Sequence, residues 1–327
     1  MNQRMLWGGV ALFVVVVVGA TALLGADTGA SSPGHLSVSA QPKCFGAAAR
    51  AHKQPCENPR LRLSVIPPPR DALIEPSAPC TPVRLSEPPS RCWFGVGRSR
   101  ADATVALVGD SHSVHWRAAM TRVARARRWR GISIYQTRCP YTTARTAIDG
   151  ALGTACTQWK QDVLQWFQHH PEVHTMFVSE NTSARVSISK GEDMFQVKVA
   201  GYAAAWRALP ASVRRIIVIR DPPHNVGATL GCVERAIRQR RRPGPACSRP
   251  RSRALEPDAA IVAAERAHSP RVRTIDLTQF MCDTTRCYPV VGGVLVHKDK
   301  GHLTRTFSVT LGPFLLRRVN SLIAHWR

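Results

Sequence analysis

The sequence of 327 residues predicts a three-layer α/β fold built around a mainly parallel sheet. Short apolar runs, each long enough for one buried strand, alternate with amphipathic segments from residue 101 to the C-terminus. Such runs are typical of parallel strands, whose crossover helices cover both faces of the sheet. The length allows one large domain with appendages, or two domains, and no internal repeat is present.

The strands and helices expected in the domain at 101–327 follow in order. Apolar runs predict strands at 104–108, 132–136, 173–179, 214–221 and 271–278. Helical periodicity predicts helices at 113–129, 157–170, 195–209, 256–268 and 302–326, the last being one long helix or a pair broken near Pro313. In the second helix, Trp159, Val163, Trp166 and Phe167 fall on one side, which predicts its buried face.

The N-terminal segment at 1–26 combines a short head with an uncharged apolar stretch at 6–26. At about 1.5 Å per residue, a helix over this stretch reaches roughly 30 Å, enough to cross the hydrocarbon core of a membrane. The apolar region of a secretory signal is usually shorter, about 7–15 residues, so we favour an uncleaved single-pass anchor. Cleavage after Thr28-Gly29-Ala30, giving a secreted protein, is the alternative. Either way, the remainder is expected on the extracytoplasmic side.

The ten cysteines agree with export. An even count spread through an exported chain is typical of a disulfide framework. The sequence contains no CxxC pair, which argues against a zinc site, and we expect neither a metal nor a cofactor. We expect each cysteine to pair with its neighbour in sequence, giving Cys44–Cys56, Cys80–Cys92, Cys139–Cys156, Cys232–Cys247 and Cys282–Cys287.

The region at 27–100 is rich in Pro, Ser and Ala. Prolines at this density are incompatible with a regular helix or a central strand. Two of the expected disulfides fall within the region and would hold it in a compact, irregular shape. We therefore predict an extension packed against the α/β domain rather than a free linker.

Positive charge is the second unusual feature, with a formal net charge of +24. Arginines concentrate at 122–130 and at 235–253. Export argues against nucleic acid as a partner, and no nucleic-acid-binding motif accompanies the two runs. Anionic lipid headgroups or acidic envelope polymers remain as partners, and a merely solvated surface is the alternative. The second run follows a strand on the expected active-site edge, so its arginines could shape substrate access.

Two short motifs suggest chemistry. The sequence GDSH at 109–112 follows the first predicted strand, which places Ser111 at a carboxyl strand end, where ligands bind in such sheets. A serine hydroxyl needs a base, and Asp299 precedes His302 by three residues in DKGH near the C-terminus. Each motif alone also fits a helix cap or a surface turn. Together they predict a Ser–His–Asp arrangement.

The two motifs resemble the Gly-Asp-Ser and Asp-x-x-His blocks of the SGNH (GDSL-like) hydrolase superfamily. More narrowly, four segments resemble the SGNH domain attached to bacterial membrane O-acyltransferases of cell-envelope glycans. They are ALVGDSHSVHW, RCP after the second strand, the CxxxxC at 282–287 and DKGHLT. The segment CFGAAARAHKQPCENP resembles the one joining the two parts in actinobacterial members. The resemblance covers about residues 44–327. The multi-pass acyltransferase half of those relatives is absent from this sequence, so a stand-alone domain is expected.

The resemblance implies roles for particular residues. Ser111 would be the nucleophile, His302 the general base and then acid, and Asp299 the residue that orients His302. Asp110 would be a structural turn residue. The superfamily's glycine after the second strand and its Gly-x-Asn-Asp block are missing here, so the oxyanion donors are the backbone N–H of Ser111 and, as a candidate, Asn181 after the third strand.

His112 and His115 lie three residues apart on the predicted helix. They could be metal ligands, but no third ligand stands nearby in sequence. We favour His112 as a pocket-lining residue beside the nucleophile.

Two function classes remain open. The first is an exported serine esterase or O-acyltransferase that acts on an acylated cell-envelope glycan through an acyl-Ser111 intermediate. The second is a non-catalytic module that binds envelope glycan or docks a membrane acyltransferase. The complete Ser, His and Asp set favours the first class, and the missing oxyanion blocks favour the second. The partners expected in the first case are the glycan, a separate membrane acyltransferase and the membrane itself.

Overall fold

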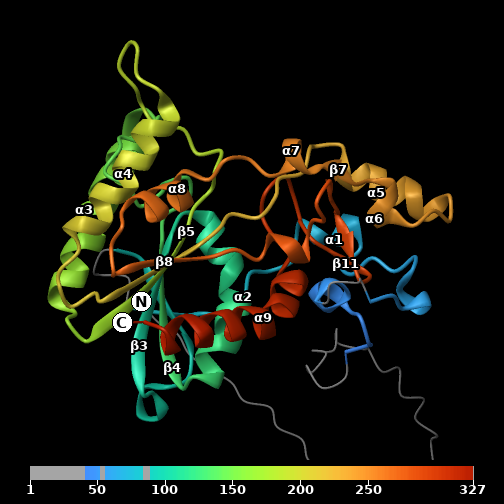
Figure 1. Ribbon diagram of the computed structural model, residues 1–327, viewed down its shortest axis with the longest axis horizontal. Helices are drawn as coiled ribbons and strands as arrows, with labels where there is room; N and C mark the ends of the chain where they lie inside the picture. Colours follow the sequence, from blue (N-terminus) through green and yellow to red (C-terminus); the bar gives the residue numbers. More distant parts are fainter. Residues whose placement is uncertain (1–40, 52–55, 84–88, 327) are drawn as a thin grey trace, which may run out of the picture. The chain divides into compact units, whose positions relative to one another are not determined.

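The computed structural model describes residues 41–51, 56–83 and 89–326. Within them, seven strands form one sheet whose central members are parallel (Figure 1). The strands lie across the sheet in the order β1 (Thr81–Pro82), β2 (Arg91–Gly95), β4 (Trp129–Tyr135), β3 (Ala103–Gly109), β5 (Val173–Ser179), β6 (Arg215–Ile219) and β8 (Val272–Ile275). Both β1 and β2 run antiparallel to their neighbours.

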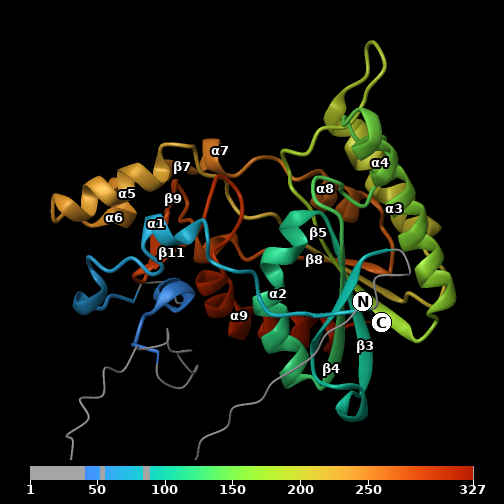
Figure 2. The ribbon, with the colours of Figure 1, turned by 180° about the vertical axis from the view of Figure 1, so that it is seen from behind.

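Helices cover both faces of this sheet, which gives the expected three layers. One face packs against α2 (Ser111–Ala126) and α9 (Arg305–Ala324). The other face packs against α3 (Gly150–His169), α4 (Met194–Ala208) and α8 (Ala259–Arg266). The shorter helices are α1 (Pro69–Ala72), α5 (Thr229–Arg238), α6 (Pro243–Ala246) and α7 (Arg251–Ala254), with single 3₁₀ turns η2 (Gly46–Arg50), η3 (Pro59–Leu61), η4 (Arg98–Arg100) and η5 (Thr278–Phe280). Figure 2 shows α5 and α6 at the opposite end from α3 and α4.

The strand side chains divide between the two cores with the period of two that a pleated strand imposes. In β3, Val105 and Leu107 enter the core shared with α2 and α9, whereas Ala106 and Val108 enter the core shared with α3 and α4. All four side chains are buried. A strand buried on both faces reads as a continuous apolar run, and this is why β3 could be predicted from the sequence.

The region before residue 101 contributes to both the core and the sheet. Phe45 and Ala47 are buried in the core that α9 covers, and Gly46 donates its backbone N–H to Gly292 O at 3.0 Å. An irregular shape does hold for most of 56–83, but the prediction was wrong for 91–95. These residues form β2, which lies between β1 and β4. The strand is compatible with the composition because the prolines before it end at Pro89 and leave β2 free of them.

Of the two forms left open for the C-terminal helix, the structure has the unbroken one, because α9 runs for 20 residues through Pro313. Its buried face, including Phe307, Leu311 and Leu315, packs along α2 and outweighs the loss of one backbone hydrogen bond. The sequence also missed α5, which lies in the arginine-rich run.

The cysteines pair in the order that the sequence favours. The bonds are Cys44–Cys56, Cys80–Cys92, Cys139–Cys156, Cys232–Cys247 and Cys282–Cys287. The predicted anchor at 6–26 lies outside the described residues. Among the helices that are described, none combines the length and the apolar character needed to cross a membrane.

Candidate active site

Ser111 is the first residue of α2, directly after β3. Asp110 is the N-cap of α2, and its Oδ1 accepts the backbone N–H of His112 at 2.8 Å. Gly109 takes a positive φ of 147°, and a Cβ there would lie 2.2 Å from Ser179 O. Only glycine fits this close approach of β3 and β5. The GDS sequence therefore forms a sharp strand-to-helix turn that presents the serine hydroxyl at the carboxyl edge of the sheet.

Three side chains from opposite ends of the domain meet at this edge. The Oγ of Ser111 lies 2.9 Å from Nε2 of His302. On the far side of the same ring, Nδ1 lies 2.8 Å from Oδ2 of Asp299. An ionised carboxylate only accepts hydrogen bonds, so Nδ1 carries the proton and Nε2 is left to accept from the serine hydroxyl. This is the geometry that makes a serine nucleophilic.

Asp299 also shapes the turn that carries His302. Its Oδ1 accepts the backbone N–H groups of Gly301, at 2.9 Å, and of His302, at 2.7 Å. Partial burial acts to raise the pKa of the Asp299 carboxyl, but the hydrogen bonds from His302 and Gly301 outweigh it and hold that pKa well below its usual range. The carboxylate therefore stays ionised near neutral pH and fixes the orientation of the imidazole.

A pocket of about 350 Å³ opens over Ser111 and His302. Residues from four parts of the chain line it: the extension at 73–78, the first turns of α2, the end of β4 and the turn at 298–305. Glu75 holds the extension in place, because its carboxylate accepts the backbone N–H of Arg305 at 2.6 Å and of Thr306 at 3.0 Å. The extension thus forms one wall of the pocket and is tied to the helix that follows His302.

The family model described as "SGNH domain (fused to AT3 domains)" matches residues 79–317. This chain belongs to that SGNH family. Among solved structures, the SGNH domain is similar to the one described as the lipopolysaccharide acetyltransferase periplasmic domain of Salmonella ser. Paratyphi A, with a TM-score of 0.52 and 11% sequence identity. The match covers 71% of this chain and 90% of the other, and at this identity it shows the fold. No curated protein matches the sequence.

The loop after β5 lies beside the serine turn in this SGNH domain. The backbone N–H of Asn181 donates to Oδ2 of Asp110 at 3.0 Å, and the Asn181 side-chain Oδ1 accepts the N–H of Ser183 at 2.8 Å. These bonds leave Nδ2 as the donor that Asn181 can offer to a ligand. Glu180, which the sequence analysis did not single out, accepts the backbone N–H groups of Asp110 and Tyr141. Burial, with the nearby Asp110, raises the pKa of Glu180 well above its usual value.

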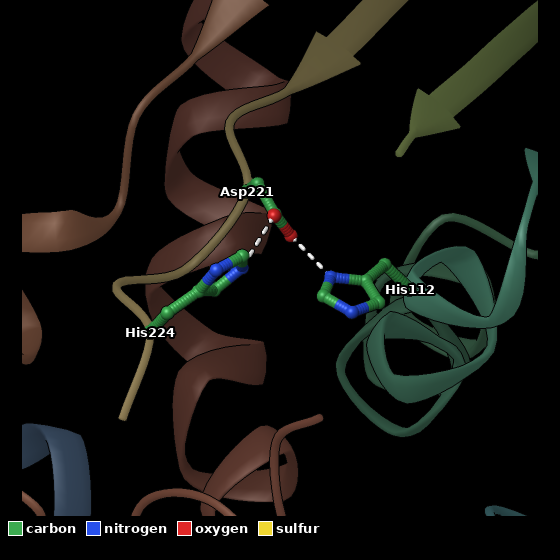
Figure 3. A group of neighbouring side chains, drawn as sticks. All are labelled: His112, Asp221 and His224. Carbon is green, nitrogen blue, oxygen red and sulfur yellow. Dashed lines mark hydrogen bonds and ion pairs between the residues drawn. The ribbon is translucent and has the colours of Figure 1, made fainter. Parts of the chain in front are cut away.

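A second set of hydrogen bonds, centred on Asp221 after β6, lies next to these residues (Figure 3). Asp221 Oδ1 lies 2.5 Å from Nδ1 of His112, and Oδ2 lies 3.0 Å from Nε2 of His224. Oδ2 also accepts the backbone N–H of Thr182 at 2.8 Å and its hydroxyl at 3.1 Å. Asp221 therefore joins α2, the loop after β5 and the loop after β6.

The donor types of His112, Asp221 and His224 would suit a metal ion, since the three offer ligand atoms within 4.8 Å of one another. Their contacts fit a hydrogen-bonded array better. Each imidazole nitrogen lies at hydrogen-bonding distance from an Asp221 oxygen, and Oδ2 also accepts the N–H and the hydroxyl of Thr182. Burial acts to lower the pKa of His112, but Asp221 outweighs it and raises that pKa to about 9. His112 is thus a buried imidazolium paired with a carboxylate.

The prediction that His112 lines the pocket was wrong. Its side chain is 1% exposed and turns toward Asp221. His115, one turn later on α2, lines the pocket instead, and its Nδ1 accepts the N–H of Leu303 at 3.4 Å. The physical reason is the bond to Asp221, which holds the His112 ring away from the pocket although His115 lies on the same side of α2. A signal for Asp221 was present in the sequence: an acidic residue two positions after the apolar run 216–219, at a carboxyl strand end.

Proposed function

We propose that this SGNH domain is an exported serine esterase or O-acyltransferase that acts on an acylated cell-envelope glycan through an acyl-Ser111 intermediate. The observation that carries the proposal is the continuous contact from Ser111 Oγ through the His302 ring to Asp299, at 2.9 and 2.8 Å, at the floor of an open pocket. Membership of the SGNH family adds support, because its description places such domains in fusions with acyltransferases.

The reaction would proceed in two halves. In the first, His302 Nε2 takes the hydroxyl proton as Ser111 Oγ attacks the acyl carbonyl carbon, and the carbonyl oxygen becomes an oxyanion. Collapse of this intermediate breaks the ester bond, and the leaving alcohol receives the proton from His302. In the second half, water or a sugar hydroxyl gives its proton to His302 and attacks the acyl carbon. The bond between that carbon and Ser111 Oγ then breaks, and His302 returns the proton to Ser111. Water makes the protein an esterase, whereas a sugar hydroxyl makes it a transferase.

Two donors are proposed for the oxyanion. The backbone N–H of Ser111 belongs to the first turn of α2, where helical N–H groups have no intrahelical acceptor and the helix dipole favours negative charge. Asn181 Nδ2 is the second donor, and the bonds of Asn181 to Asp110 and Ser183 support it by fixing the residue beside the serine turn. Each such donor contributes about 10²–10³ in rate.

The surroundings of the reaction are also part of the proposal. The similar Salmonella domain is periplasmic and belongs to an acetyltransferase that modifies lipopolysaccharide. By analogy, the present domain would lie on the extracytoplasmic side, held by the apolar segment at 6–26, and would work with a separate membrane acyltransferase. Five disulfides in the described residues fit an oxidising compartment.

Labelling with a serine-directed fluorophosphonate tests this function on the full chain in detergent. We expect the wild-type protein to be labelled at Ser111, and Ser111→Ala to abolish both labelling and hydrolysis of a p-nitrophenyl ester. His302→Ala should lose nearly as much, because the two residues act as one unit. Ser183 also contacts a histidine and is exposed, so Ser183→Ala is the matched control and should be labelled like wild type. An unlabelled wild-type protein would instead favour a glycan-binding or docking module.

A further inference from the structure

A second pocket, of about 360 Å³, lies on the other side of the turn that carries the catalytic histidine. Lys298, Asp299 and His302 line the first pocket, whereas Lys300, between them in sequence, lines the second. The two pockets are therefore neighbours across a single turn. The side chains that give the second pocket its character are Ser183, His224, Arg249, Arg253, Glu256 and Lys300.

The walls of this pocket are held by hydrogen bonds. His224 donates from Nε2 to the buried Asp221 at 3.0 Å, so its Nδ1 accepts from the hydroxyl of Ser183 at 3.1 Å. Arg249 donates its guanidinium to the carbonyl oxygens of His224 and of Arg253, the latter at 3.0 Å. On the catalytic side, Lys300 O accepts a backbone N–H from Asn225 at 2.7 Å. The pocket is thus formed before any ligand arrives.

Two cations at this pocket are unpaired. Lys300 and Arg253 are exposed, and neither side chain contacts a hydrogen-bond or ion-pair partner in the described part of the chain. Glu256 supplies the carboxylate of the lining, and its Oε2 lies 3.3 Å from the same Ser183 hydroxyl, whose single proton is shared between Glu256 and His224. Arg249 adds a third cation whose donors are partly used. The pocket therefore has a net positive charge and spare donors.

We propose that this second pocket binds an anionic substituent, a carboxylate or a phosphate, of the glycan whose acyl group is handled at Ser111. The identity of the bound glycan as the substrate of Ser111 rests on the proposed function. The binding of an anion in this pocket does not. The Arg253 guanidinium can donate two parallel hydrogen bonds to either anion, and the Lys300 ammonium adds a compact positive charge beside it. A repeating acidic polymer can fill both pockets at once, with one unit at Ser111 and the charge of a neighbouring unit beyond the turn.

The shape of the pocket favours a glycan over a membrane surface. Lipid headgroups are held by clusters of exposed Lys and Arg on open faces. Here the cations border a hollow whose wall includes His224, the ring of which lies 3.5 Å from where a Cβ of Gly301 would be. An anion held there would lie beside the turn whose Gly301 directly precedes His302 in sequence. The net charge of +24 would further steer an acidic polymer toward the protein.

Calorimetric titration of the full chain in detergent tests the proposal with tetragalacturonic acid as the acidic probe and maltotetraose as the neutral one. We expect wild type to bind the acidic tetramer and inorganic phosphate to displace it. Arg253→Gln with Lys300→Gln should weaken that binding tenfold or more. The matched control, Lys190→Gln with Arg238→Gln, removes the same charge from exposed positions outside the pocket and should stay within twofold of wild type.

Three results would overturn the subsite. One is equal weakening in both double variants, which would show a net-charge effect only. Another is equal binding of maltotetraose and the acidic tetramer. The third concerns binding to phosphatidylglycerol vesicles, measured with the same proteins. If the Arg253/Lys300 variant lost vesicle binding but kept its affinity for the acidic tetramer, the two cations would be a lipid contact. The fluorophosphonate carries no glycan, so its reaction with Ser111 should be unchanged in the Lys190/Arg238 control variant. Failure of labelling in wild type would refute the proposed function and leave the binding result standing.

Discussion

At the scale of single residues, Asp299 does two separable things. Its Oδ2 meets the imidazole of His302, and its Oδ1 accepts two backbone N–H groups of the turn. Asp299→Asn keeps an oxygen for the turn but can present an amide N–H to the ring, which favours the wrong tautomer. We expect esterase turnover to fall by up to about 10⁴-fold, with little change in thermal stability.

Asp299→Ala is the comparison that separates the two contributions. It removes the turn hydrogen bonds as well, so we expect the same loss of turnover together with a lower melting temperature. Turnover near the wild-type rate in Asp299→Asn would mean that His302 is oriented by other groups, and the assigned role of Asp299 would fail.

Asn181 is the residue whose role depends most on one atom. Asn181→Ala removes Nδ2 and also the acceptor for the Ser183 N–H. Asn181→Ser keeps an acceptor for that N–H but lacks the amide donor. If Nδ2 stabilises the oxyanion, both variants should lose about 10²–10³ in kcat with KM nearly unchanged. If Asn181 only caps the loop, Asn181→Ser should react like wild type.

The buried His112 predicts how stability depends on pH. Its pKa of about 9 lies above the ordinary 6.5, so the folded protein keeps a proton that the unfolded chain releases in this range. The stabilisation is fully present below about pH 6.5 and is lost as the pH rises through 9. Its upper limit is about 3 kcal/mol, at 1.36 kcal/mol per pKa unit.

Urea unfolding between pH 6.5 and 9.5 measures this effect as the difference between wild type and His112→Gln. Other groups change stability with pH in the opposite direction. One is Lys160, because burial lowers its pKa to about 8, but it is present in both proteins and so cancels in the difference. Burial also lowers the pKa values of His115 and His297, so those groups change stability only below about pH 6.5. A wild-type advantage that stays constant across the range would show that His112 is neutral in the folded protein.

At the scale of elements, Glu75 connects the extension to α9. Its carboxylate accepts the backbone N–H groups of Arg305 and Thr306 and the hydroxyl of Thr306, which caps the start of the helix that follows His302. Negative charge at a helix N-terminus is favourable for the same reason. Glu75→Ala should therefore cost about 1–2 kcal/mol of stability, as loss of a helix cap does.

The same substitution should change substrate binding, because Glu75 belongs to the wall of the pocket over Ser111. We expect KM for an ester substrate to rise more than kcat falls. Asp71→Ala is the matched control, an exposed acidic residue of the same extension whose contact is a surface ion pair with Arg70, and it should change stability by less than about 0.5 kcal/mol. Equal effects of the two substitutions would argue against a structural link through Glu75.

At the scale of the whole molecule, the disulfides should contribute unequally. In the chain-entropy account, a bond stabilises by restricting the unfolded chain, and more so for a longer loop. Cys139–Cys156 closes 17 residues and Cys282–Cys287 closes 5. Paired alanine substitutions should cost about 3 and about 2 kcal/mol respectively, measured by urea unfolding. Near-equal costs, or a larger cost for the short loop, would show that native-state packing dominates.

The sequence by itself predicted the three layers and the candidate residues of the site. Short apolar runs such as 104–108, repeated between amphipathic segments, are typical of strands that a parallel sheet buries on both faces, so β3, β5 and β6 could be predicted from local pattern. Ser111 and His302 were predictable because each lies in a short motif with a chemical meaning. The pairing of neighbouring cysteines was predicted, but ten cysteines allow many pairings and the structure decided among them.

Only the tertiary structure decided what depends on contacts between distant segments. The helix α9 continues through Pro313 because packing on α2 outweighs a local propensity, and 91–95 joins the sheet because an edge beside β4 is available. His112 and Asp221 are 109 residues apart, and nothing in either neighbourhood signals that they form a buried ion pair. Local sequence encodes propensity and motif, whereas pairing, burial and the shape of both pockets arise only when the strand ends are brought to one edge of the sheet.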